Sequence, residues 1–80
     1  MFYTYILKSD YSNHYYIGST SNLTVRLSEH NLGRVKSTKK YLPWKIIYYE
    51  TFNTKPEAIK REFKIKSYKG GNAFKQLIKI

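Results

Sequence analysis

Three segments dense in aromatic and β-branched residues constrain the fold of this chain more than any other feature. They are Phe2–Leu7, Tyr15–Gly18 and Trp44–Phe52, and residues of these types favour β-strands. Polar, turn-forming residues separate the first two segments, which predicts a β-hairpin with a loop longer than a tight turn. The third segment has apolar residues on both faces, so we expect it to be the central strand of the sheet.

Capping signals predict three helices. Polar residues precede Leu23, and Gly33 suits the left-handed position just past a helix end, so we expect a helix over about residues 23–32. The spacing of a capping box at residues 54–57, with proline in the first turn, predicts a second helix that reaches about Tyr68. Asn72 can cap a short third helix.

The apolar residues of the last two helices have helical spacing and are expected to face the core. They are Ala58, Ile59, Phe63 and Ile65 in the second helix, and Phe74, Leu77 and Ile78 in the third. Eighty residues allow one modest core. We therefore predict a single α+β domain over residues 1–80.

The chain is strongly basic, with fifteen Lys and Arg residues against five Asp and Glu residues and a formal net charge of +10. A folded domain with this excess attracts polyanions, so nucleic acid is the expected partner. Single lysines often serve solubility alone. In the basic stretch from Arg34 to Tyr41, we take Lys36, Lys39 and Lys40 as candidate phosphate contacts.

Several classes of protein are disfavoured. The chain has no cysteine, so we expect no disulfide-linked partner and no thiolate zinc site. The apolar stretch at the N-terminus is too short for a secretory signal or a membrane span. These features predict a cytoplasmic protein without a membrane partner. The sequence does not fix the oligomeric state, although a monomer is the favoured expectation.

Arg26 and His30 are four residues apart in the first predicted helix, so they project from one face. We expect them to lie off the Leu23 and Leu27 stripe that packs against the sheet. The planar guanidinium group of an arginine can bind phosphate oxygens and stabilise charge in a transition state. The plainer interpretation is an exposed arginine beside an exposed histidine.

Glu62 lies among basic residues, on or beside the inward face of the second helix. It can form a salt bridge with Lys66 or with Arg26. It can also hold Mg²⁺, which typically takes one or two protein carboxylates and fills its other positions with water and phosphate. The five acidic residues are scattered, so the sequence disfavours a two-metal centre and allows at most a one-metal site.

Tyrosines 3, 5, 15 and 16 suit half-buried strands, and packing is the expected role of most of them. A tyrosine that activates water needs its pKa lowered from the usual value of about 10, which a nearby cation such as Arg26 can do. Gly18, at the end of the second strand, allows backbone or ligand to approach closely.

Four fragments of the chain together carry a family resemblance. Tyr3-Thr4-Tyr5 and Tyr16-Ile17-Gly18 stand where two signature tripeptides are found, with Tyr3 in place of the first glycine. The stretches 18–31 and 61–66 look like the segments that carry a catalytic arginine and a metal-binding glutamate. In order and spacing, the chain resembles the GIY-YIG nuclease family, particularly small stand-alone bacterial members related to the N-terminal nuclease domain of the excision-repair subunit UvrC.

The resemblance implies a three-stranded antiparallel sheet flanked by helices, and cleavage of DNA at a single Mg²⁺ or Mn²⁺ ion. It implies that Glu62 holds the metal and that Arg26 binds the scissile phosphate. Tyr5 or Tyr16 would help to activate water, and His30 would orient a tyrosine or contact the phosphate. Asn72 is similar in place to a late asparagine of several members, although a helix cap is its plainer role.

Two hypotheses follow for the function. The first is an endonuclease directed by DNA structure rather than sequence, because basic loops supply affinity but little base readout. The alternative is a nucleic-acid-binding module of the same fold with weak or no turnover. A purely structural domain would show no salt-dependent DNA binding at all.

Overall fold

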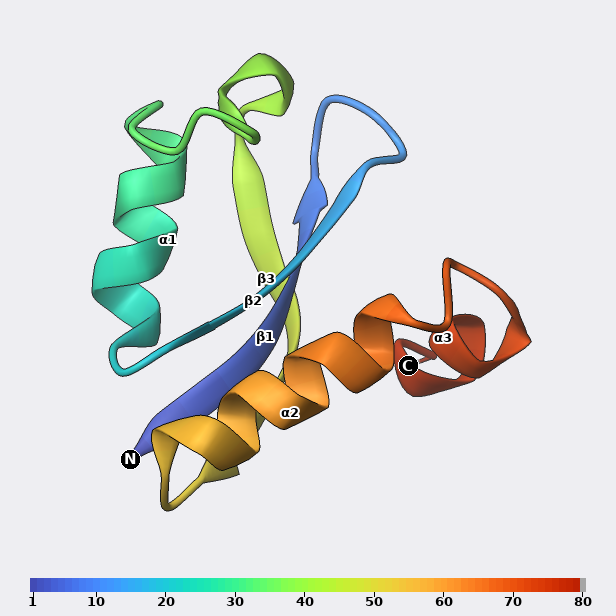
Figure 1. The fold of residues 1–80 in the computed structure, drawn as a ribbon. Helices are drawn as coiled ribbons and strands as arrows, with labels where there is room; N and C mark the ends of the chain where they lie inside the picture. The colour runs from blue at the N-terminus through green and yellow to red at the C-terminus, as the bar shows by residue number, and fades with distance from the viewer. Residues whose placement is uncertain (80) are drawn as a thin grey trace.

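The computed structural model describes residues 1–79 and contains a sheet and three α-helices (Figure 1). The elements in chain order are β1 (Phe2–Ser9), β2 (Tyr15–Thr20), α1 (Leu23–Asn31), a 3₁₀ turn (Lys39–Tyr41), β3 (Trp44–Phe52), α2 (Lys55–Lys66) and α3 (Asn72–Leu77). The three-stranded antiparallel sheet and the α+β class are as predicted.

The strand order is β2-β1-β3, so β1 is the central strand. The expectation that Trp44–Phe52 is central was wrong, because β3 pairs only with β1 and forms an edge. β3 has apolar residues on both faces because α1 partly covers one face of the sheet, and α2 and α3 partly cover the other. In β1, by contrast, residues 4–7 are all buried, although the tyrosine and threonine there made the segment look only half-buried.

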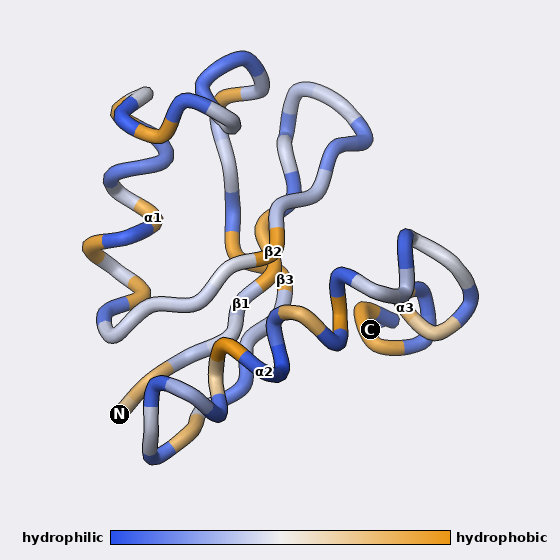
Figure 2. The backbone as a smooth tube through the Cα atoms, viewed as in Figure 1, coloured by the Kyte–Doolittle hydropathy of each residue, from blue (hydrophilic) through white to orange (hydrophobic). Residues whose placement is uncertain are grey.

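One face of the sheet packs against α1 and the opposite face against α2 and α3 (Figure 1). On the α1 face, the buried cluster consists of Tyr5, Leu7 and Trp44, with Leu23 and Leu27 of α1 against it. On the α2 face, the buried cluster consists of Ile6, Ile65 and Phe74. Figure 2 shows hydrophobic residues gathered where the strands cross and hydrophilic residues in the outer loops.

Most of the helix boundaries lie where the capping signals in the sequence predicted them. Asn22 caps α1 by accepting a hydrogen bond from the backbone of Val25, and Gly33 has the expected positive φ of 75°. The capping box of α2 is formed between Thr54 and Glu57. The capping role predicted for Asn72 was wrong, because Gly71 occupies the N-cap position and Asn72 is the first residue of α3.

The inward face of α2 is narrower than expected. Ala58 and Ile65 are fully buried, but Phe63 is 63% exposed, so its predicted place in the core was wrong. Phe63 follows Ile59 by four residues, yet Ile59 is half-buried and Phe63 is exposed. The helix also ends at Lys66 rather than near Tyr68. Among residues 1–79, no helix is long and apolar enough to cross a membrane.

Candidate active site

Tyr5 and Gly18 are directly opposite each other on β1 and β2. A Cβ atom at Gly18 would lie 2.7 Å from the Tyr5 hydroxyl oxygen and 2.9 Å from Cε2 of Tyr16. Both distances are far below van der Waals contact, so only glycine leaves room for the two rings here. The space that we expected Gly18 to offer to a ligand is therefore occupied by tyrosine. The Tyr5 ring therefore lies against Gly18 of the edge strand β2, with its hydroxyl beside the glycine.

A chain of buried hydrogen bonds begins at that hydroxyl. The Tyr5 hydroxyl lies 3.1 Å from His30 Nε2, and His30 Nδ1 lies 2.8 Å from Thr38 Oγ1. The Thr38 hydroxyl donates to the Val35 carbonyl, so its oxygen accepts from His30 Nδ1–H. His30 then keeps a lone pair on Nε2, which accepts the Tyr5 O–H. The network fixes both the tautomer of His30 and the direction of the Tyr5 proton.

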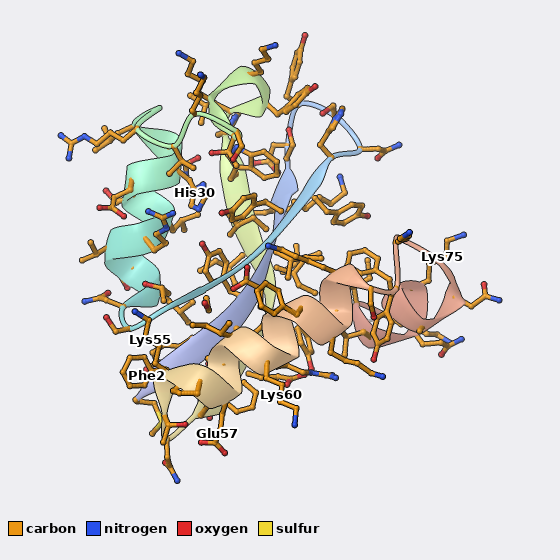
Figure 3. All side chains as sticks on the ribbon, in the orientation of Figure 1. Phe2, His30, Lys55, Glu57, Lys60 and Lys75 are labelled. Atoms are coloured by element: carbon orange, nitrogen blue, oxygen red, sulfur yellow. The ribbon has the colours of Figure 1, made fainter. Side chains whose placement is uncertain are left out.

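His30 is fully buried and points from α1 toward the sheet (Figure 3). This position corrects the expectation that it lies off the Leu23 and Leu27 stripe. Residues 23, 26, 27 and 30 have the spacing of a single helical face. Burial, followed by the nearby positive charge of Arg26, lowers the pKa of His30 to about 4. At neutral pH the ring is therefore an uncharged acceptor.

Arg26 lies between an acid and the two tyrosines. Its Nη1 atom donates to Oε1 of Glu29 at 3.0 Å, and about one third of the side chain is exposed. The bond to Glu29, followed by interactions with Tyr5 and Tyr16, raises the pKa of Arg26. The guanidinium group is thus a permanent positive charge at the site, with part of its surface open to an incoming anion.

Tyr5 itself is a weak acid in this setting. Burial raises the pKa of the Tyr5 hydroxyl to about 12, although the neighbouring Arg26 opposes the increase, and the negative charge of Glu62 adds to it. We expected a cation to lower a tyrosine pKa here, but for Tyr5 desolvation exceeds the effect of Arg26. The phenol stays protonated at neutral pH and serves as a fixed hydrogen-bond donor to His30.

Tyr16 is the more accessible of the two candidate tyrosines. It is half-buried on the edge strand, with its ring 4.7 Å from that of His30 and 6.2 Å from that of Tyr5. Tyr3 and Tyr15 pack as predicted, against Tyr49 and Phe74 respectively. The packing roles of Tyr3 and Tyr15 therefore agree with the geometry, and the site roles of Tyr5 and Tyr16 stay a prediction.

Glu62 approaches the same site from α2. Its Oε2 accepts from Lys66 Nζ at 2.6 Å, and its side chain is only 14% exposed. Of the two predicted ion pairs, the one with Lys66 is present. Within residues 1–79, Glu62 Oε1 has no hydrogen-bond partner. Every buried side-chain nitrogen or oxygen atom in that range has a partner. Oε1 is therefore not buried and is accessible to solvent. Glu62 is also close enough to Tyr5 to raise its pKa.

Another carboxylate beside α2 has a different environment. Glu50 of β3 accepts two hydrogen bonds from Arg61, at 2.9 and 3.0 Å, and one from the Tyr48 hydroxyl. The Arg61 and Tyr48 bonds lower the pKa of Glu50, although burial opposes them. Both oxygens of Glu50 are used within the fold, whereas Glu62 keeps one oxygen free.

Three of the predicted residues lie together beside β2, with Tyr5 from β1, Tyr16 from β2 and Arg26 from α1. Glu62 of α2 is near enough to Tyr5 for its charge to contribute to the raised pKa of that tyrosine. Two surface cavities lie elsewhere, and none of the four lines them. One of about 200 Å³ is lined by Phe2, Ser19, Thr20, Ser21, Lys55 and Ala58.

The remaining candidates lie apart from this centre. Lys36, Lys39 and Lys40 are exposed and line the second cavity, of about 550 Å³, between α1 and β3. Thr38, in the same loop, connects that basic segment to His30. Asn72 is exposed at the start of α3, and its side chain forms no hydrogen bond within residues 1–79. The structure does not bring it together with the four central residues.

Sequence reasoning missed two residues of the site. Thr38 is 1% exposed and completes the network around His30, but a threonine in a basic loop gives no signal of burial. Glu29 forms an ion pair with Arg26 and so uses part of its guanidinium group. Its spacing of three residues from Arg26 on a helix was a signal that we did not use.

The donor set restricts what metal the site can hold. Among residues 1–79, no group of three or more His, Cys, Asp or Glu side chains is placed to bind an ion. One accessible carboxylate oxygen, on Glu62, fits Mg²⁺ or Mn²⁺, which keep several waters and bind substrate phosphate. It does not fit zinc, which needs three or four protein ligands.

Comparisons with known proteins agree with this fold. A UPF0213 protein of Listeria welshimeri is 43% identical over 75 residues, covering 92% of this chain and 82% of the relative. One of Staphylococcus haemolyticus is 40% identical over 67 residues, covering 82% and 80%. The solution NMR structure of the UPF0213 protein BH0048 from Bacillus halodurans has a TM-score of 0.60 and 28% identity, covering 98% of this chain and 83% of that one.

A family model described as the GIY-YIG catalytic domain matches residues 1–75. This range includes both tyrosine tripeptides, α1 and α2, and so Tyr5, Tyr16, Arg26 and Glu62. The match assigns the chain to a family of nuclease type, whereas the names of the UPF0213 relatives state no activity. The chain therefore belongs to the GIY-YIG catalytic domain family.

Proposed function

We propose that this protein is a metal-dependent endonuclease that hydrolyses DNA phosphodiester bonds and recognises DNA by shape and phosphate contacts. The observation that supports this most is that Arg26 and two tyrosines lie together beside β2, with Glu62 near enough to act electrostatically on Tyr5. The net charge of +10 gives the surface the affinity for a polyanion that such a site needs. The lack of cysteine fits action in the reducing cytoplasm.

Glu62 would hold a single Mg²⁺ or Mn²⁺ ion through its free oxygen, with Lys66 on the other oxygen. When bound, the ion would neutralise charge on the phosphate and make a bound water more acidic. The site residues would do the rest. Arg26 would turn part of its guanidinium group toward the scissile phosphate and stabilise its developing negative charge.

The two tyrosines would have different roles. Tyr5 has a pKa of about 12 and donates its hydrogen bond to His30, so its oxygen would accept a hydrogen bond from the attacking water and position it. Neutral His30, with a pKa of about 4, would orient Tyr5 rather than take protons from substrate. Tyr16 is the more exposed and would assist the attacking water.

Groups outside the centre would hold the DNA. Lys36, Lys39 and Lys40 lie on the loop attached to His30 through Thr38, and would bind the DNA backbone beside the site. Gly18 would contribute indirectly, by giving the tyrosines room. Asn72 would contact DNA only beyond the far end of α2. These contacts carry no base-specific information, so substrate choice would depend on DNA structure.

One observation favours the alternative of a DNA-binding module with little turnover. Both charges on which the mechanism depends are already paired, Arg26 with Glu29 and Glu62 with Lys66. These are partly exposed pairs, which contribute little energy and open readily. A phosphate and a metal ion would compete well with them, so the pairing does not outweigh the arrangement of the site residues.

Purified protein incubated with supercoiled, branched and single-stranded DNA, with and without Mg²⁺ or Mn²⁺, tests the proposal. Wild type is expected to nick DNA only with metal. Arg26→Ala and Glu62→Gln are expected to lose nicking while they still bind DNA in a salt-dependent way. Lys75→Ala, an exposed residue on α3, serves as a control for lost charge. If wild type binds but never nicks, or both variants nick like wild type, the enzyme proposal fails.

A further inference from the structure

Phe63 is the exposed aromatic residue on α2, with 63% of its surface open. Lys60, Lys64 and Lys66 are also exposed around it on the same helix, and Lys60 projects away from the sheet (Figure 3). The contact recorded for its ring is with Lys66, whose Nζ lies 5.9 Å from the ring centroid. The helix thus presents an aromatic face surrounded by positive charge.

Phe63 is close to the candidate active site. Lys66 Nζ is 5.9 Å from the Phe63 ring centroid and 2.6 Å from Glu62 Oε2. Because both distances share that nitrogen, the ring lies within their sum, about 8.5 Å, of the carboxylate. Successive nucleotides in one strand of a duplex rise by about 3.4 Å. The ring is therefore within about three nucleotides of the Glu62 carboxylate.

We propose that Phe63 is a stacking platform for an unpaired base next to the scissile phosphate. The substrate class that it selects is DNA with an unpaired nucleotide beside the cleaved bond, such as a flap, a gap or a single strand. The inference rests on the proposed function for the position of the cleaved bond. It adds a residue that determines which DNA structures are preferred.

The chemistry of the patch supports a nucleotide as the occupant. A base has a flat face that stacks on a phenyl ring, and its phosphates pair with the lysines on either side. Bases inside an intact duplex already stack on one another, so they cannot cover Phe63 without local opening. The ring would therefore favour DNA in which a base is already free.

The charges argue against a second copy of the chain as the occupant. Two such patches would bring Lys60, Lys64 and Lys66 of each copy against those of the other, on molecules of charge +10. Like charges placed together oppose association. A polyanion that carries planar rings satisfies both features of the patch at once.

The test compares Phe63→Leu, which stays apolar but cannot stack, with Phe63→Trp, which can. Tyr11→Leu is the matched control, because Tyr11 is 73% exposed on the hairpin loop, away from α2. Binding of each protein to a fluorescein-labelled flap and to the matching intact duplex is measured by anisotropy without metal. Cleavage of both DNAs with Mg²⁺ is measured separately.

Wild type, Phe63→Trp and Tyr11→Leu are expected to prefer the flap. In Phe63→Leu, the ratio of flap to duplex affinity is expected to fall about 5- to 100-fold, the loss for one base–aromatic stack. If Phe63→Leu keeps the wild-type ratio, or wild type shows no preference, the platform is refuted. It is also refuted if Phe63→Leu instead abolishes self-association in sedimentation. If the ratio falls but no protein cleaves DNA, the platform stands and the endonuclease proposal fails.

Discussion

The two faces of the sheet use the central strand β1 in opposite ways. On the α2 face, Ile6 packs against Ile65 and Phe74 in an apolar cluster. On the α1 face, Tyr5 leads into a buried hydrogen-bond chain through His30 and Thr38. Buried polar groups cost free energy unless they are paired, and here all of them in residues 1–79 are paired. The comparison separates a face that supplies stability from one that fixes the orientation of a reactive group.

The largest expected effect is on the apolar face. Ile65→Ala removes a side chain that is fully buried and leaves a cavity, so the free energy of unfolding is expected to fall by about 2–5 kcal/mol. Urea unfolding measures this loss. If the faces are separate, the NMR signals of His30 in the folded variant stay in place. A shift in those signals as large as that of a residue on α2 would break the comparison.

The polar face is expected to weaken at low pH. The pKa of His30 is about 4 in the folded protein, against about 6.5 in an unfolded chain. As pH falls from about 6.5 toward 4, the unfolded state binds a proton that the folded state does not, so stability decreases. The loss is about 3 kcal/mol.

Urea unfolding at pH 7.5 and at pH 4.5 measures that loss, with His30→Gln as the control. The variant is expected to show a smaller pH dependence of the free energy of unfolding than wild type, because the contribution of His30 is removed. An NMR titration in which His30 protonates near pH 6.5 would contradict the burial and the network assigned to it.

A smaller effect sharpens the role of Thr38. Thr38→Val keeps the shape but removes the acceptor of His30 Nδ1–H, leaving a buried donor unpaired at a cost of about 1–3 kcal/mol. The His30 proton is also expected to move to Nε2, which ends its acceptance from Tyr5. Nitrogen chemical shifts of the ring report the tautomer, and Thr38→Ser should retain the wild-type form. An unchanged tautomer in the valine variant would show that Thr38 does not fix it.

Local signals in the sequence predicted most elements correctly. The capping box at Thr54 correctly predicted the start of α2, and Gly33 correctly predicted the end of α1. Both predictions succeed because helix caps depend on residues a few positions apart. The strand order was not predictable in this way. β3 has the longest apolar run, yet β1 is central, since strand order depends on how distant layers cover the sheet.

The candidate site shows the same limit. Tyr5, Tyr16, Arg26 and Glu62 could be named from the sequence, because the pattern of residue types resembles a family. The environments of these residues could not be predicted from the sequence. The high pKa of Tyr5 arises from burial under α1, and Thr38 enters the site from a loop eight residues beyond His30. The pKa of Tyr5 and the position of Thr38 both depend on packing between distant elements. The spacing of residues in the sequence does not predict such packing.

The most direct test compares the two carboxylates beside α2. Glu50 is fully used by Arg61 and Tyr48, whereas Glu62 keeps one oxygen free at the β2 edge. Single-turnover cleavage of a flap DNA with Mg²⁺ is measured for wild type, Glu62→Gln and Glu50→Gln, after urea unfolding confirms that each is folded. Glu62→Gln is expected to lose at least about a hundredfold in rate, and Glu50→Gln to stay close to wild type. Equal losses in the two variants, or full activity in Glu62→Gln, would contradict a hydrolytic centre at the β2 edge.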